Sequence, residues 1–145
     1  MNILADTNLY IASMRRSGLK RKLLWRILET NNSLVLTDFI IEELRANFDE
    51  LYKPTEAQVA LDLLLQFLET GLVIVKLAPE YQIHLEAAAE FVPQKDTPVL
   101  AATMLEEIDF LITWDAKHFL KNTKLMNSPW GNKIKHPDKL LEMLR

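Results

Sequence analysis

The sequence contains no cysteine. This absence excludes disulfide bonds, a catalytic thiolate and the zinc or iron–sulfur sites that cysteines hold, and it suits a reducing compartment. The chain also has no apolar run near the roughly 20 residues needed to cross a bilayer. Its start, MNILADTN, lacks a basic leader followed by a long apolar run. We therefore expect a soluble, cytoplasmic protein without a membrane contact.

Internal repeats, low-complexity tracts and linkers are absent as well. A chain of 145 residues is long enough to bury a sizeable core within one domain. We predict a single domain that spans residues 1–145.

The formal net charge of -3 conceals an uneven distribution of charged residues. Residues 1–30 hold six Lys/Arg and two acids, and residues 111–145 hold seven Lys/Arg and three acids. The middle of the chain, residues 31–110, holds only four Lys/Arg but fifteen acids. The two basic ends could contact a polyanion together if the fold brings them close, because local fields rather than net charge steer a charged ligand. Two solvated basic faces explain the pattern equally well.

Short apolar runs rich in β-branched residues alternate with longer segments of helical period. This order predicts an α/β protein: a three-layer α/β/α, Rossmann-like fold around a central, mostly parallel sheet of four to five strands. We expect strands at Ile3–Ala5, Leu34–Leu36, Leu72–Val75, Phe110–Thr113 and, with a weaker signal, Lys133–Lys135. We expect helices at about Asn8–Met14, Leu19–Thr30, Asp38–Leu51, Thr55–Thr70, Pro79–Val92, Pro98–Glu107 and Asp138–Leu144.

Residues typical of helix ends support these boundaries. Gly71 and the pair Asn31–Asn32 follow periodic runs, as residues that end helices do. The stretch KNTKLMNSPWGNK, residues 121–133, has no clear period. It predicts a surface loop.

Three acids lie near the edge of the sheet where open α/β folds place their ligand sites, outside the carboxyl ends of the strands. Asp6 follows the strand ILA, Asp115 follows FLIT after one tryptophan, and Asp96 lies in the turn PQKDTP before a helix. Each could equally be a helix N-cap, which is worth about 1 kcal/mol.

A fourth acid comes from the helix TDFIIEELRANF. At about 100° per residue, Glu43 borders the apolar side of this helix, whereas Glu42 faces water. A carboxylate beside an apolar stripe has no backbone amide to cap and needs another partner. Four carboxylates in one cleft would repel one another unless a cation held them. An oxygen-rich ligand set without cysteine suits Mg²⁺ or Mn²⁺, and such an ion supports phosphodiester hydrolysis.

Four stretches, ILADTNLYIAS, TDFIIEELRANF, KDTPVLAAT and LITWDAKHF, resemble the four motifs of the PIN-domain family, in order and at compatible spacing. The stretch IKHPDKLLEML is similar to the closing strand and helix of that family. The resemblance implies a PIN-like fold and a metal-dependent endoribonuclease that leaves a 5′-phosphate and a 3′-hydroxyl.

The resemblance also implies which residues act. It gives catalysis, and the binding of one or two Mg²⁺ or Mn²⁺ ions, to Asp6, Glu43, Asp96 and Asp115. Asn8 and Thr113 match polar positions that support these carboxylates, although ordinary helix caps explain them too.

The sequence departs from the family pattern at two positions. Many relatives have a further acid near the third motif, where this chain has Gln94 and Lys95. Trp114 stands where a small residue is common before the last Asp, and it could stack on a base or fill the turn. The histidines His84, His118 and His136 show no ligand spacing, and we assign none of them to metal or general-base work.

A basic segment, RRSGLKRK, lies between the first two predicted helices. Contacts from it to an RNA backbone would be independent of base sequence and would weaken with salt. A solvated helix junction is the alternative. The residues assigned to RNA binding are Arg15, Arg16, Lys20, Arg21, Lys22 and Lys95.

The preferred hypothesis from sequence is a VapC-like PIN endoribonuclease, the toxin of a toxin–antitoxin pair. By resemblance it would cleave RNA, form a homodimer and be silenced by an antitoxin protein. The first alternative is a non-catalytic PIN-like module that binds RNA or protein. A haloacid-dehalogenase-like phosphatase is a weaker alternative, because that family needs a second Asp where Asn8 stands.

Overall fold

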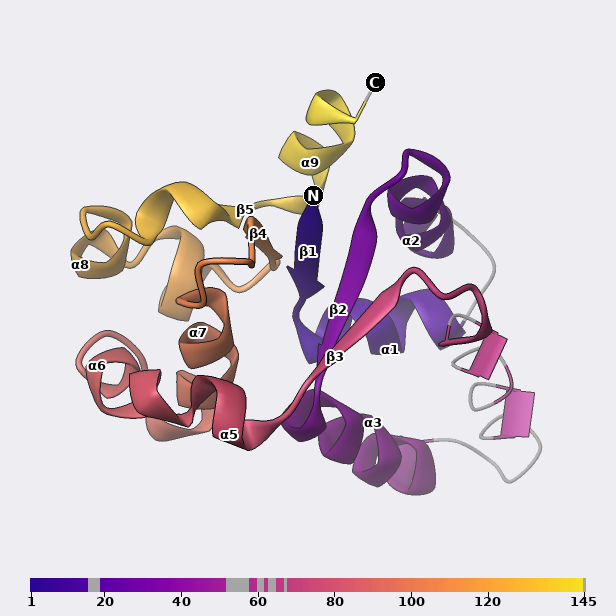
Figure 1. Ribbon diagram of the computed structural model, residues 1–145, viewed down its shortest axis with the longest axis horizontal. Helices are drawn as coiled ribbons and strands as arrows, with labels where there is room; N and C mark the ends of the chain where they lie inside the picture. Colours follow the sequence, from indigo (N-terminus) through magenta and orange to yellow (C-terminus); the bar gives the residue numbers. More distant parts are fainter. Residues whose placement is uncertain (16–18, 52–57, 60–61, 63–64, 67, 145) are drawn as a thin grey trace.

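A computed structural model describes residues 1–15, 19–51, 58–59, 62, 65–66 and 68–144. Its centre is one sheet of five strands, and every pairing within it is parallel. Helices flank this sheet in a three-layer α/β/α arrangement (Figure 1). The predicted fold class is confirmed. The strands are β1 (Asn2–Ala5), β2 (Ser33–Thr37), β3 (Val73–Lys76), β4 (Phe110–Ile112) and β5 (Ile134–Lys135).

The strand order β3-β2-β1-β4-β5 creates a switch point beside the central strand. From β1 the chain builds outward through β2 and β3, and it then crosses back to add β4 and β5 on the other side. Ligands of open α/β sheets bind where this reversal occurs, outside the carboxyl ends of the strands. The first place to look for a site is therefore the edge where β1 and β4 end.

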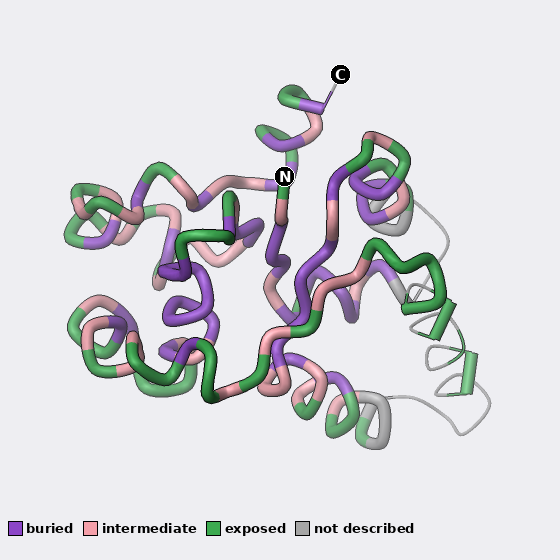
Figure 2. The backbone as a smooth tube through the Cα atoms, viewed as in Figure 1, coloured by how far each residue is buried: buried purple, intermediate pink, exposed green. Residues whose placement is uncertain are grey.

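All five strands were predicted from sequence, and each end differs from the structure by at most one residue. Buried parallel strands read as near-continuous apolar runs because helices cover both faces of the sheet. In β1 the last three residues, Ile3, Leu4 and Ala5, are completely buried. The tube in Figure 2 shows most of the central strands as buried.

The first three helices also follow the prediction: α1 (Thr7–Arg15), α2 (Leu19–Glu29) and α3 (Asp38–Leu51). Gly71 has a φ of 72° and Asn31 a φ of 61°, the left-handed conformation that ends helices. Half of the predicted helix Thr55–Thr70 lies outside the described residues. Its described residues between 58 and 69 are helical.

The single helix predicted over Pro79–Val92 is wrong. The chain forms three short pieces instead: α5 (Ala78–Tyr81), the 3₁₀ turn η1 (Gln82–His84) and α6 (Leu85–Ala89). Buried Tyr81 donates a hydrogen bond from its hydroxyl to Asp38 at the start of α3. This contact anchors α5, and the helical path tightens directly after it.

The helix predicted over Pro98–Glu107 is shorter than expected. It follows the 3₁₀ turn η2 (Gln94–Asp96) and forms α7 (Thr97–Thr103). Lys133 donates from Nζ to the carbonyl oxygens of Thr103 and Leu105, at 3.0 and 2.9 Å. The end of α7 is thus satisfied by a lysine that is distant in sequence.

The surface loop predicted over residues 121–133 is also wrong. This segment contains α8 (Thr123–Met126) and the 3₁₀ turn η4 (Gly131–Lys133), and it buries Leu125 completely. The π-helical turn η3 (Ala116–Leu120) precedes it, and α9 (Pro137–Met143) closes the chain. A helical period of apolar residues cannot be recognised in a helix of a single turn, so the sequence pattern did not predict these short helices.

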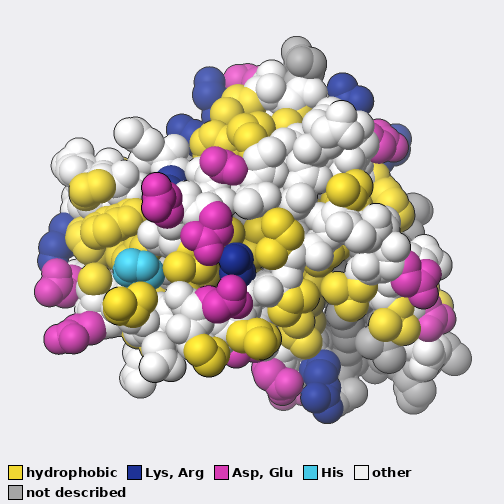
Figure 3. Space-filling model, viewed as in Figure 1, with side chains coloured by type: hydrophobic (Ala, Val, Ile, Leu, Met, Phe, Trp, Pro, Cys, Tyr) yellow, Lys and Arg dark blue, Asp and Glu magenta, His cyan; other side chains and the backbone are white. Residues whose placement is uncertain are grey.

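Exposed hydrophobic side chains gather near the edge strand β3 among the described residues. They include Leu72, Val75, Leu77 and Ile83, and Figure 3 shows hydrophobic side chains at several places on this face. The edge strand β3 is thus less completely covered than the central strand β1. In the described part of the chain, no helix is both long and apolar enough to cross a bilayer.

Candidate metal site at the carboxyl edge of the sheet

Two of the predicted acids lie where β1 and β4 end. The backbone N–H of Asp6 donates to the carbonyl of Ile112 at 3.0 Å, which continues the β1–β4 pairing past the strand end. Asp115, three residues after Ile112, is the N-cap of η3. The switch point of the sheet therefore brings Asp6 and Asp115 to one edge.

Thr113 connects these two acids. Its completely buried hydroxyl donates to Oδ2 of Asp6 at 3.0 Å and accepts from the backbone N–H of Asp115 at 3.0 Å. One hydroxyl thus fixes a carboxylate from β1 and the backbone that carries a carboxylate after β4. This contact is of the kind that the sequence analysis assigned to Thr113.

Asp115 is both a helix cap and a member of the cluster. Its Oδ1 accepts from the backbone N–H of His118 at 2.9 Å and so caps η3. Its Oδ2 lies 3.2 Å from Nδ1 of His118. The capping explanation therefore holds for Asp115, but it accounts for only one of the two oxygens.

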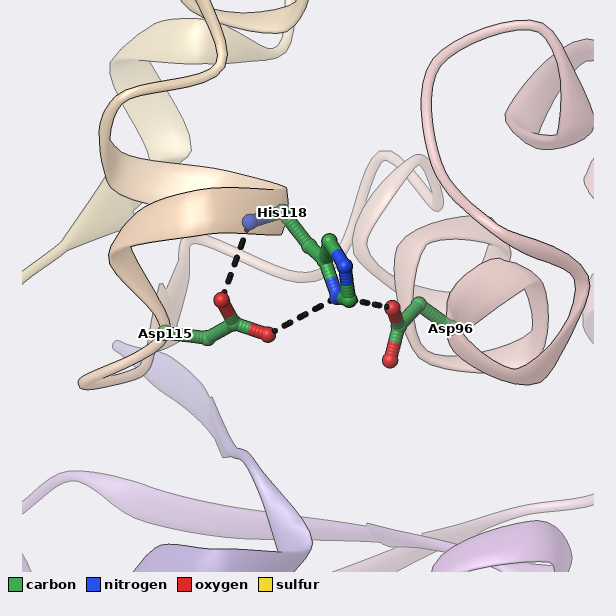
Figure 4. Close-up of side chains that lie close together, drawn as sticks. All are labelled: Asp96, Asp115 and His118. Atoms are coloured by element: carbon green, nitrogen blue, oxygen red, sulfur yellow. Dashed lines mark hydrogen bonds and ion pairs between the residues drawn. The ribbon is translucent and has the colours of Figure 1, made fainter.

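Asp96 has no such capping role. It occupies the N-cap position of α7 but makes no side-chain hydrogen bond to that helix. Its Oδ2 instead lies 2.8 Å from Nδ1 of His118. The turn η2 thus directs this carboxylate toward the π-helical turn after β4 (Figure 4).

Glu43 lies on the inner side of α3, as the helical period indicated. Its Oε1 accepts a hydrogen bond from the hydroxyl of buried Thr7 at 2.8 Å. Glu42 is exposed and pairs with Arg45 at 3.5 Å. Asn8 is exposed, and within the described part of the chain its side chain makes no hydrogen bond to any of the four acids. Thr7 thus supports Glu43, and the supporting role of Asn8 stays a prediction.

The tightest group in the site is Asp96, Asp115 and His118. One donor atom from each lies within 4.8 Å of the other two, and all three side chains are partly buried. Asp6 and Glu43 lie outside this group but near enough for their charges to interact with Asp96. The structure thus divides the predicted quartet into one close pair with a histidine and two flanking acids.

Burial is the main influence on the ionisation of these acids. It raises the pKa values of Asp6, Glu43 and Asp96 above their usual range. Neighbouring carboxylates raise these pKa values further, whereas the hydroxyls of Thr113 and Thr7 lower those of Asp6 and Glu43. The charges of His118 and Lys95 lower that of Asp96. Negative charge is thus costly here without a cation.

The residues of the site fit a divalent cation. Oδ2 of Asp96 and Nδ1 of His118 are buried 2.8 Å apart, and Oδ2 of Asp115 lies 3.2 Å from the same nitrogen. Three donor atoms thus face one another at a single point. Carboxylate oxygens together with an imidazole nitrogen are normal ligands of such ions.

Of the residues assigned to RNA binding, Lys95 lies close enough to the acids to influence their ionisation. It is exposed, and its charge lowers the pKa values of both Glu43 and Asp96. Lys22 is exposed on α2. Trp114 is half-buried and packs against the core, which agrees with a tryptophan that fills the turn. Arg16 and the side chains of Arg15, Lys20 and Arg21 lie outside the described residues.

Sequence reasoning missed two residues of this edge, His118 and Thr7. His118 lies three residues after Asp115, a spacing that puts both on one face of a helical turn. Thr7 follows Asp6 directly, and its buried side chain contacts Glu43. The spacing between Asp115 and His118 is visible in the sequence, whereas the contact between Asp96 and His118 depends on the fold.

The raised pKa values predict that, without a metal ion, the negative charges of these acids destabilise the folded protein. A folded-state pKa above the ordinary 3.8 of Asp means that the folded state binds more protons, so stability falls as pH rises through the raised value. We expect Asp6→Asn to raise the free energy of unfolding by about 1 kcal/mol near pH 7. The gain should shrink toward about pH 5.

Urea unfolding in EDTA at both pH values measures this effect. Glu42→Gln is the control, because exposed Glu42 makes only a surface ion pair, and its substitution should change stability little. An Asp6→Asn protein that is less stable than wild type at both pH values would contradict the prediction.

Comparison with known proteins adds a structural relative. The chain matches no family model and no curated protein at a significant level. It does match a chain of a solved structure, described as VapBC2 from Rickettsia felis bound to a DNA fragment from their promoter. The TM-score is 0.61 at 16% sequence identity, and the match covers 94% of this chain and 98% of that one. The fold is PIN-like. At this identity the likeness concerns the fold alone.

Proposed function

We propose that this protein is a metal-dependent endoribonuclease of the PIN-domain type. The observation that carries the proposal is the grouping of Asp96, Asp115 and His118 beside Asp6 at the switch point of a PIN-like sheet. Such a group of partly buried donors suits a divalent cation, and the four motifs resemble those of RNA-cleaving relatives.

In the proposed reaction, a water oxygen bonds to phosphorus and the bond from phosphorus to the 3′ oxygen breaks. A proton passes to the 3′ oxygen, which leaves a 5′-phosphate and a 3′-hydroxyl. Asp96 and Asp115 would hold Mg²⁺ or Mn²⁺, with Asp6 close by. The bound ion supplies positive charge and lowers the pKa of water. Glu43, oriented by Thr7, accepts a hydrogen bond from the attacking water.

Lys95 is proposed to contact the RNA phosphates. Its exposed ammonium lies close enough to Glu43 and Asp96 to influence both carboxylates. A cation at the rim of an acidic site offsets the repulsion between the carboxylates and a polyanion. Contacts of this kind are independent of base sequence and weaken with salt.

We further propose that the enzyme is the toxin of a toxin–antitoxin pair. The support is the resemblance of the motifs to VapC-like toxins, together with the fold shared with a chain of the Rickettsia felis VapBC2 structure. Under this proposal an antitoxin protein silences the nuclease and the toxin forms a homodimer.

Cleavage of a defined single-stranded RNA tests the proposal. We expect purified protein to cut it with Mg²⁺ or Mn²⁺ and to stop on addition of EDTA. The upstream product should carry a 3′-hydroxyl and the downstream product a 5′-phosphate. RNA binding without cleavage in either metal would favour the non-catalytic module instead. Products with a cyclic phosphate would contradict the proposed chemistry.

A further inference from the structure

His118 lies at the centre of the candidate site although the acidic quartet does not include it. Its backbone N–H donates to Oδ1 of Asp115, and its Nδ1 lies 3.2 Å from the other oxygen of that carboxylate. The same Nδ1 lies 2.8 Å from Oδ2 of Asp96. Figure 4 shows the ring between the two carboxylates, which come from separate parts of the chain.

One ring nitrogen and two carboxylate oxygens converge at a buried point. Nδ1 of His118 and Oδ2 of Asp96 are both buried and lie 2.8 Å apart, and Oδ2 of Asp115 lies 3.2 Å from the same nitrogen. Each of these atoms belongs to a group that commonly binds metal ions. A cation is therefore a partner that all three atoms can bind.

The ring is carried by backbone that is held in place. Asn122 donates from Nδ2 to the carbonyl of His118 at 2.9 Å and to the carbonyl of Phe91 at 2.7 Å. Phe91 precedes the turn that carries Asp96, so one amide ties both sides of the cluster together. A firmly held backbone is what a metal-ligand residue requires. Turns of π-helix such as η3 are rare and occur often at functional sites.

We propose that Nδ1 of His118 is a direct metal ligand, and that with Asp96 and Asp115 it selects a transition-metal ion such as Mn²⁺ or Co²⁺ over Mg²⁺. The inference rests on the proposed metal-dependent function and adds the identity of one ligand. Mg²⁺ prefers an all-oxygen shell, whereas imidazole nitrogen favours the later divalent metals. One histidine in the set therefore shifts the preference of the site.

Electron spin-echo spectroscopy of bound Mn²⁺ tests the ligand directly. We expect modulation from a directly bound imidazole nitrogen in the wild-type protein, and this signal should change when histidine is labelled with nitrogen-15. The signal should vanish in His118→Gln and persist in His84→Gln, the matched control on η1. Bound Mn²⁺ without nitrogen modulation in the wild type overturns the proposal, whether or not a variant folds.

Calorimetric titration with Co²⁺ and Mg²⁺ tests the selectivity. Loss of a residue that only supports a metal ligand typically lowers metal affinity by roughly 10- to 100-fold. We expect His118→Gln, which removes a ligand, to lower Co²⁺ affinity at least as much and Mg²⁺ affinity less. Equal losses for the two metals, or none, overturn the proposal. A protein that binds no divalent metal overturns it too.

The outcome is separable from that of the proposed function. RNA cleavage with bound Mn²⁺ but no nitrogen modulation would leave the nuclease proposal standing and remove His118 as a ligand. Mn²⁺ bound by the histidine nitrogen without RNA cleavage would establish His118 as a ligand and remove the nuclease proposal.

Discussion

Asp96→Asn is expected to lower the rate of metal-dependent RNA cleavage about a thousandfold, equivalent to about 4 kcal/mol in the activation free energy. The substitution removes a charged oxygen from the group formed with Asp115 and His118. An amide oxygen is a poorer ligand for a divalent ion than a carboxylate, so the ion is lost or displaced. Rates measured at saturating Mn²⁺ with one defined RNA give the effect.

The fold should survive this substitution. Asp96 makes no capping hydrogen bond to α7, and burial raises its pKa, so its charge does not stabilise the folded state. The melting temperature of Asp96→Asn without metal should therefore equal or exceed that of wild type. In wild type, Mn²⁺ at about 100 times its dissociation constant should stabilise the fold by about 2.7 kcal/mol, and this gain should disappear in the variant.

Glu42→Gln is the matched control for activity. Glu42 is the exposed neighbour of Glu43 on α3 and pairs only with Arg45. Its cleavage rate should stay near that of wild type. Cleavage by Asp96→Asn within tenfold of wild type would show that Asp96 does not hold the essential ion.

The framework of this site could be predicted because it follows directly from sequence pattern. The apolar runs located β1 and β4, and the parallel topology then brings Asp6 and Asp115 to one edge. The period of α3 correctly turned Glu43 inward and Glu42 outward. Each of these inferences needs only local sequence and one general rule of sheet architecture.

Contacts between distant segments could not be predicted in this way. His118 meets Asp96 only because the turn before α7 and the turn after β4 converge in space. Lys133 ends α7 from a position 30 residues later in the chain. No periodicity of either segment carries this information. For the same reason, the stretch that contains Lys133 looked like a surface loop although it packs against the rest of the fold.

Gly131 provides a test of that packing. A Cβ atom at this buried position would lie 2.1 Å from the carbonyl oxygen of Met126 and 2.6 Å from its carbonyl carbon. These are backbone atoms, so the clash cannot be relieved by rotation of a side chain. We expect Gly131→Ala to lower the free energy of unfolding by about 3 kcal/mol.

Gly71→Ala separates this clash from the general cost of replacing glycine. Gly71 has a φ of 72°, but a Cβ atom there would meet nothing within 4 Å. Gly71→Ala should lower the free energy of unfolding by only about 1–2 kcal/mol, the cost of placing an alanine in the left-handed conformation. Urea unfolding of both variants in EDTA gives the comparison, and equal losses would mean that the backbone of residues 121–133 shifts easily to admit the added methyl group. Because Asn122 caps α8 and holds the carbonyl of His118, a displaced α8 should also weaken Mn²⁺ binding in Gly131→Ala but not in Gly71→Ala.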